Sequence, residues 1–148
     1  MKNKILPPKY FLLFLVLLIG LHFIFPVTKI IYAPYNWLAL LFIIFGIVIN
    51  LWADNMFKKA KTTVKPNKEP TALITSGPFC LTRHPMYLGM AAILLGASVF
   101  LGSLITLIFP IIFIFLMQII FIPSEEKDLE AAFGQKYREY KKKVRCWI

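Results

Sequence analysis

Four long apolar segments dominate this sequence, at residues 10–25, 37–57, 86–101 and 104–122. Of the 148 residues, 59% are hydrophobic and 16% are aromatic, which is more than a soluble core of this size buries. A helix of about 20 apolar residues spans the roughly 30 Å hydrocarbon core of a bilayer. The sequence therefore predicts an all-α membrane protein with four transmembrane helices in a single domain, residues 1–148.

Positive charges predict how these helices are oriented. Only Gly102 and Ser103 separate the last two segments, so these segments should form a tight antiparallel hairpin. Three Lys precede the first segment, six Lys and Arg lie in residues 58–85 and seven lie in the tail, whereas the 26–35 loop has only Lys29. With four spans, sixteen of the seventeen cations fall on one side. Because cytoplasmic loops are enriched in Lys and Arg, both chain ends should be cytoplasmic.

Charge, cysteine and histidine usage limit the possible partners. The formal charge is +10, but the cations lie beside apolar segments, where attraction to anionic lipid headgroups, about 1 kcal/mol per residue, explains them better than nucleic acid does. Cys80 and Cys146 are far apart in basic stretches and are expected to be free thiols. His22 and His84 have no metal-ligand spacing around them, so no metal site is predicted.

The tail is predicted to form a cytoplasmic amphipathic helix over residues 124–143. Pro123 and Ser124 resemble a helix start, and acidic residues in the first turn suit the helix dipole. An apolar stripe recurs every three or four residues, at Leu129, Phe133, Tyr137, Tyr140 and Val144. Such a helix can lie on the membrane or fold back over the bundle.

Polar residues converge where the third segment begins and the fourth ends. The hairpin makes these ends neighbours, so His84 and the glutamates that follow the fourth segment can share one site. Pro85 suits the first position of a helix, and the amides after it can bind an anion. Glu125 and Glu126 can receive an amine or ribose hydroxyls. A zwitterionic cofactor would fit between the two ends.

Each of these features also has a simpler interpretation. Arg83 and His84 can be ordinary juxtamembrane polar residues, and Tyr87 can be an interfacial aromatic residue. Small residues at Gly89, Ala92 and Gly96 form a face that lets either another helix or a cofactor approach the backbone closely. It is the convergence of these features that favours a site.

Two motifs connect this convergence to a family. The stretches TALITSGPFCLTRHPMYLG (71–89) and EEKDLEAAFGQKYREYKKKVR (125–145) resemble the integral-membrane methyltransferases that include isoprenylcysteine carboxyl methyltransferases and phospholipid N-methyltransferases. The paired patterns RHPxYxG and EExxLxxxFGxxYxxY are specific in combination. No GxGxG loop after a strand is present, which excludes a Rossmann-type methyltransferase.

The resemblance implies an S-adenosylmethionine cavity built from the third and fourth helices, the loop before them and the tail. Gly89 would leave room for the cofactor. The cofactor contacts that it implies fall on Leu73, Ile74, Phe79, His84, Pro85, Met86, Tyr87, Gly89, Glu125 and Glu126. No residue is assigned as catalytic, because methyl transfer from a sulfonium needs alignment rather than a covalent nucleophile.

The prediction about the methyl acceptor depends on one departure from the family pattern. In the isoprenylcysteine enzymes an arginine about one turn before the glutamate pair suits an acceptor carboxylate, but Phe121 holds that position here. This departure favours a lipid-like or other hydrophobic small molecule that carries an amine, hydroxyl or thiol. Arg83 and Arg145 are the next candidates to hold a carboxylate. The alternatives are a carboxyl methyltransferase, an NADPH enzyme like the membrane sterol reductases, and a non-enzymatic membrane protein.

Overall fold

The computed structural model describes residues 6–25, 28–62 and 70–148, and the fold of these residues is all-α. The α-helices are α1 (Pro7–Ile24), α2 (Ala39–Lys59), α3 (Pro85–Leu101), α4 (Ile108–Leu116), α5 (Ile122–Phe133) and α6 (Gln135–Lys143). Short 3-10 segments cover Tyr35–Leu38, Gly77–Cys80 and Leu104–Leu107, and a π-helical turn covers Met117–Phe121. Lys2, Lys4, Lys65 and Lys68, which contribute to the predicted charge asymmetry, lie outside the described residues.

Three helical stretches are long and apolar enough to cross a bilayer: Pro7–Ile24, Tyr35–Lys59 and Leu104–Phe133. The remaining apolar helix, α3, has 17 residues. Large apolar side chains on the outer faces of α1 and α2, such as Val16, Leu41 and Val48, are exposed. Such surfaces are stable in lipid, where helices satisfy their own backbone hydrogen bonds. The protein is a multi-pass integral membrane protein.

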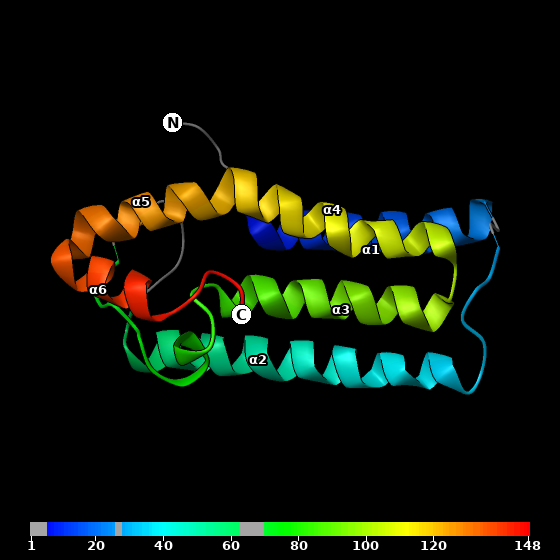
Figure 1. The fold of residues 1–148 in the computed structure, drawn as a ribbon, viewed down its shortest axis with the longest axis horizontal. Coiled ribbons are helices and arrows are strands. Elements are labelled where there is room, and N and C mark those ends of the chain that lie inside the picture. The colour runs from blue at the N-terminus through cyan, green and yellow to red at the C-terminus, as the bar shows by residue number, and fades with distance from the viewer. Residues whose placement is uncertain (1–5, 26–27, 63–69) are drawn as a thin grey trace.

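Helix α3 lies at the centre of the bundle, between α2 on one side and the pair α1 and α4 on the other (Figure 1). Glycines allow α2 and α3 to pack backbone against backbone. A Cβ atom on Gly46 would lie 2.5 Å from the Gly89 carbonyl oxygen, and one on Gly96 would lie 2.8 Å from that of Ala39. The predicted small-residue face therefore accommodates a neighbouring helix.

The hairpin between α3 and the next helix has the tight turn that the sequence predicts. Gly102 ends α3 in the left-handed conformation, with φ +70°, which glycine adopts without steric cost. Two buried side chains then join the hairpin arms. The Ser98 hydroxyl lies 2.7 Å from the Thr106 carbonyl oxygen, and the Thr106 hydroxyl donates to the Ser103 carbonyl at 2.7 Å.

The predicted boundary between the fourth span and the tail is wrong. The helix passes through Pro123 and Ser124 without a break, so one helical stretch extends from Leu104 to Phe133. Proline lacks an amide hydrogen and its ring crowds the preceding turn, but a local π adjustment lets a membrane helix continue past it. The π-helical turn Met117–Phe121 ends two residues before Pro123 and provides this adjustment.

The single tail helix predicted over 124–143 is also wrong, because Gly134 divides it into α5 and α6. Gly134 has φ +53° and ψ −122°, a conformation that L side chains rarely adopt. After this turn α6 folds back over the bundle (Figure 1). Tyr137 and Tyr140 of the predicted stripe are buried there, and the Tyr140 hydroxyl donates to the Phe79 carbonyl at 2.7 Å. Of the two predicted alternatives, the structure has the folded-back one.

Candidate functional site

The start of α3 fixes the first part of the site. Pro85 occupies the first helical turn, and His84 precedes it as the N-cap residue. The His84 amide donates to the Thr82 hydroxyl oxygen at 3.2 Å, and that hydroxyl donates to the Cys146 carbonyl at 2.7 Å. The Tyr87 amide, one of the donors expected to bind an anion, donates to the His84 carbonyl at 3.1 Å. The loop, the helix start and the chain end are thereby joined.

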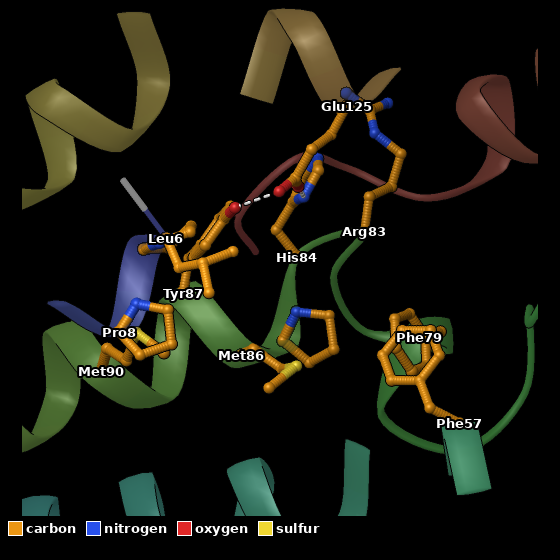
Figure 2. A pocket seen from close by; sticks show the side chains of 12 residues that line it. Leu6, Pro8, Phe57, Phe79, Arg83, His84, Met86, Tyr87, Met90 and Glu125 are labelled. Atoms are coloured by element: carbon orange, nitrogen blue, oxygen red, sulfur yellow. Dashed lines mark hydrogen bonds and ion pairs between the residues drawn. The ribbon is translucent and has the colours of Figure 1, made fainter. Parts of the chain in front are cut away.

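A polar cluster connects α3 to α5, as the sequence predicts. The Tyr87 hydroxyl donates to Glu125 (Figure 2). The His84 ring lies nearly parallel to the Tyr87 ring, with centroids 5.6 Å apart. Its Nδ1 lies 3.5 Å from Glu125 Oε2, and its Nε2 lies 3.5 Å from Glu126 Oε1. His84 therefore lies between two carboxylates.

These carboxylates decide the charge of His84. Burial by itself lowers the pKa of this imidazole, because it disfavours the charged form. Hydrogen bonding to Glu125 and Glu126 and their negative charges act in the opposite direction and outweigh burial, so the pKa of His84 is raised above 6.5. The site thus favours a histidine that carries a proton.

Glu126 makes a different set of contacts from Glu125. Its carboxylate pairs with Arg83 at 2.7 Å and with Lys141 of α6 at 2.6 Å. Arg83 in turn donates to the carbonyl oxygens of Lys141 and Val144, each at 3.1 Å. These carbonyls lie at the C-terminal end of α6, where unpaired carbonyls attract a cation. Arg83 therefore holds α5, α6 and the chain end together.

Residues of this cluster line two cavities. The first has a volume of about 170 Å³ and is mainly apolar. Figure 2 shows its polar end, where Tyr87, His84 and Glu125 meet, and its apolar lining, which includes Phe57, Phe79 and Met86. The second has a volume of about 540 Å³ and is about half polar, and its lining includes Glu126, Lys141 and Gln118. Arg83 lines both cavities.

The structure brings most of the predicted cofactor residues together. Six of the ten predicted residues line the first cavity: Phe79, His84, Pro85, Met86, Tyr87 and Glu125. Four others lie elsewhere. Leu73 and Ile74 pack against the cluster formed by Ala53, Phe79 and the α6 tyrosines, Gly89 faces Asn50 of α2, and Glu126 lines the second cavity.

The side chains of the three predicted acceptor-binding residues lie in different environments in the structure. Arg83 is engaged with Glu126 and with the end of α6. Phe121 is buried, and its ring packs edge-on against Tyr10 with centroids 5.4 Å apart. Arg145 has an exposed side chain, and its carbonyl accepts a hydrogen bond from the Arg83 amide at 3.0 Å.

Several lining residues were not predicted from the sequence. The first cavity also includes Leu6, Pro7 and Pro8 at the start of α1, together with Phe57 and Met90. The proline pair was a readable signal for the start of a helix, but nothing in the sequence places that start beside α3.

Three potential metal ligands also meet here, although the sequence shows no ligand set. Atoms of His84, Glu126 and Cys146 lie within 4.8 Å of one another. Arg83 and Lys141 already neutralise Glu126, and two cations this close disfavour a divalent ion.

Comparison with known proteins gives consistent matches. The profile of a family described as phospholipid methyltransferase matches residues 34–136. The chain is 43% identical over 63 residues to an uncharacterized protein of Haemophilus influenzae, a match that covers 43% of this chain and all of that protein. It is 38% identical over 82 residues to the protein-S-isoprenylcysteine O-methyltransferase of Schizosaccharomyces pombe, a match that covers 54% of this chain and 34% of that enzyme.

A solved structure shares the fold. The eukaryotic intramembrane Ras methyltransferase, an isoprenylcysteine carboxyl methyltransferase, superposes with a TM-score of 0.63 and 23% sequence identity. The match covers 99% of this chain and 54% of that one. The chain therefore spans about half the length of the solved enzyme and matches about a third of the yeast one.

Proposed function

The chain belongs to the phospholipid methyltransferase family, whose members use S-adenosylmethionine, and we propose that it transfers the methyl group of this cofactor to a lipid-like acceptor at the membrane interface. The observation that carries the proposal is the meeting of His84, Tyr87 and Glu125 at the polar end of an apolar cavity. Membership of this family argues against the two other functions considered from the sequence, an NADPH-dependent reductase and a non-enzymatic membrane protein.

The residues of the first cavity fit S-adenosylmethionine. This group has an apolar adenine, a cationic sulfonium and a zwitterionic amino-acid end. Phe57, Phe79 and Met86 offer aromatic and thioether surface for the apolar and cationic parts. Glu125, at the polar end, can accept hydrogen bonds from an ammonium or from ribose hydroxyls, and protonated His84 can donate to a carboxylate.

When bound, the cofactor supplies an electrophilic methyl group. The protein contributes alignment and the exclusion of water, which are the main requirements of an in-line displacement. Tyr87 and His84 hold Glu125 in one orientation, and the apolar wall keeps water from the reacting atoms. For an ammonium acceptor, the candidates to take its proton are Glu125 and His84, which both lie at the polar end of the cavity.

An amine, hydroxyl or thiol acceptor fits the site better than an acid. Phe121 gives no positive charge at the position where the isoprenylcysteine enzymes have arginine, and it is buried. The guanidinium of Arg83 is occupied by Glu126 and by two carbonyls. A buried carboxylate without a cation would cost several kcal/mol.

A carboxyl acceptor is the second candidate, because the yeast relative is named as a protein-S-isoprenylcysteine O-methyltransferase. In this case Arg83 or the exposed Arg145 would have to reorient toward the acceptor.

We also propose that the protein spans the bilayer four times, with both chain ends in the cytoplasm. With 17 residues at 1.5 Å each, α3 is about 26 Å long, slightly short of a typical hydrocarbon core. Its central place among longer helices and a small local thinning of the bilayer accommodate this length. The cation asymmetry then places residues 58–85 and the tail on one face.

The test is transfer of radiolabelled methyl to whole membrane lipids, followed by mild alkali. We expect label in the lipid extract that survives alkali as an N-, O- or S-methyl group, after correction for acyl-chain hydrolysis. Glu125→Ala, which removes a proposed cofactor contact, should strongly reduce the signal. Release of most of the label as methanol would identify a methyl ester and favour the carboxyl acceptor.

A further inference from the structure

The second cavity is a polar groove that the proposed methyl transfer does not use. It has a volume of about 540 Å³, and it lies between the end of the long helix 104–133, α6 and the chain end. We propose that this groove binds the phosphate of an anionic membrane phospholipid, at a site separate from the cavity that holds the cofactor. The residues that carry the argument are Gln118, Lys127, Glu130, Arg138 and Lys141.

The charge of the groove favours an anion. Four cationic side chains line it, and only two carboxylates oppose them. Lys141 pairs with Glu126, and Arg138 pairs with Glu130, each at 2.6 Å. Lys127 is exposed and forms no ion pair with any acidic residue in the described part of the chain. Lys127 therefore gives the groove a cation that is available to a ligand.

The place of the groove favours a lipid over a soluble anion. Gln118 and Ile122 line it and belong to the apolar stretch that includes α4. The neighbouring side chains of Ile119 and Ile120 are 71% and 53% exposed, so they present an apolar surface next to the groove. Acyl chains along this surface would place a headgroup at the level of Lys127. Basic pockets at the cytoplasmic end of membrane helices bind acidic headgroups in this way.

A hydrogen bond ties the chain end to the helix that lines the groove. Gln118 Oε1 accepts a hydrogen bond from the Trp147 indole at 2.7 Å. This bond helps to hold the chain end, where Cys146 lines the groove, against the helix. A preformed wall reduces the entropy lost when a headgroup binds.

The experiment measures lipid binding without any cofactor. The full-length chain in neutral detergent is titrated with phosphatidylglycerol, with phosphatidylcholine or with inorganic phosphate, and bound lipid is counted by native mass spectrometry. We expect one phosphatidylglycerol to bind in preference to phosphatidylcholine. Lys127→Gln should weaken this binding about fivefold, the effect of removing one cation near an anionic headgroup.

Two further variants make the result specific. Lys142→Gln removes another exposed cation, one of α6 that does not line the groove, and it should leave binding unchanged. Lys127→Arg keeps the charge and should retain binding, which separates loss of charge from loss of fold. Equal binding of the two lipids, or equal losses from Lys127→Gln and Lys142→Gln, would overturn the site.

The free anion is the remaining alternative. If inorganic phosphate displaces phosphatidylglycerol at matched concentration, the ligand is a soluble phosphate and the lipid assignment is wrong. This measurement does not depend on methyl transfer. An inactive Glu125→Gln chain should still bind the lipid, so failure of the enzymatic proposal and failure of this one are distinguishable.

Discussion

Glu125 and Glu126 are consecutive in α5, yet their carboxylates face different cavities. Neighbouring helical residues point about 100° apart, so two adjacent acidic residues cannot share one direction. Glu125 accepts a hydrogen bond from Tyr87 at the polar end of the apolar cavity. Glu126 pairs with Arg83 and Lys141 beside the polar groove. Glu125 therefore lines the proposed cofactor cavity, and Glu126 joins α5 to Arg83 and to α6.

This division predicts which residues matter for the cofactor. Glu125→Ala and His84→Ala should each weaken binding of S-adenosylhomocysteine by about 1–3 kcal/mol, because each removes a buried or charge-assisted hydrogen bond. Calorimetric titration measures the loss. Lys142→Ala, which removes an exposed cation away from both cavities, is the control. Similar losses in all three variants would mean that the histidine and the glutamate are ordinary surface residues.

Glu126 should matter chiefly for stability. Its side chain is 11% exposed and pairs with two cations, so Glu126→Gln should lower the free energy of unfolding by about 1–3 kcal/mol. Asp54→Asn removes the more exposed pair between Asp54 and Lys58, and it should cost about 0.5 kcal/mol or less. Denaturant unfolding in detergent compares the two. Equal costs would argue against Glu126 as a structural residue.

The sequence predicted the helices and the meeting point of the motifs well, for a physical reason. The apolar segments are long, and Pro85 marks a helix start. A turn of two residues requires the two helices that it joins to be antiparallel neighbours. The pairing of His84 with Glu125 follows from the hairpin alone. The apolar stripe of the tail was likewise predicted correctly, because a helical period of three to four residues is a local property.

The errors concern residues whose meaning depends on tertiary context. Pro123 resembled a helix start, but the π-helical turn before it lets the helix continue. Gly134 is the local signal for the break that divides the tail. A glycine inside a helical pattern can either end the helix or be tolerated within it, so the sequence alone did not predict the break. The placement of Leu6 and Pro8 beside α3 depends on how α1 packs, which no local pattern encodes.

His84 predicts a pH dependence of stability. The pKa of this histidine is raised above its unfolded value of 6.5, because the carboxylates of Glu125 and Glu126 outweigh the opposing effect of burial. A group with a raised native pKa binds its proton more tightly in the folded state, so its contribution is complete below 6.5 and is lost as the pH rises through the native value. The thermal midpoint should therefore fall as the pH rises above about 6.5.

Two histidine variants test this assignment. In thermal scans across the neutral range, His84→Gln should flatten the decline in the midpoint. His22→Gln should leave the decline in place, since His22 packs against Phe23 and pairs with no carboxylate among the described residues. An unchanged slope in His84→Gln would assign the pH dependence to other groups.

Thiol labelling tests the proposed orientation. Cys80 is exposed in the loop before α3, and Cys146 is partly buried near the chain end. If the cation-rich side is cytoplasmic, both should react with a membrane-impermeant maleimide only after the membrane is opened, and Cys80 should react faster. Single-cysteine chains, Cys80→Ser and Cys146→Ser, separate the two rates. Labelling of either thiol in intact cells would contradict the four-span arrangement.

The final prediction concerns the contact between α2 and α3. A Cβ atom on Gly46 would lie 2.5 Å from the backbone oxygen of Gly89, which cannot move without separating the helices, whereas a Cβ atom on Gly89 would lie 2.6 Å from the Asn50 side-chain amide. Gly46→Ala should therefore destabilise the fold by about 1–3 kcal/mol, the typical cost of overpacking, and Gly89→Ala should cost less.

Companion variants show whether helix packing is the cause. Adding Asn50→Ala to Gly89→Ala removes the crowded side chain and should restore most of the lost stability, whereas it should not rescue Gly46→Ala. A Cβ atom on Gly20 of α1 would meet no atom of the described residues within 4 Å, so Gly20→Ala should be neutral or slightly stabilising. If Gly89→Ala instead abolished cofactor binding at unchanged stability, and Asn50→Ala gave no rescue, Gly89 would make room for the cofactor rather than for α2.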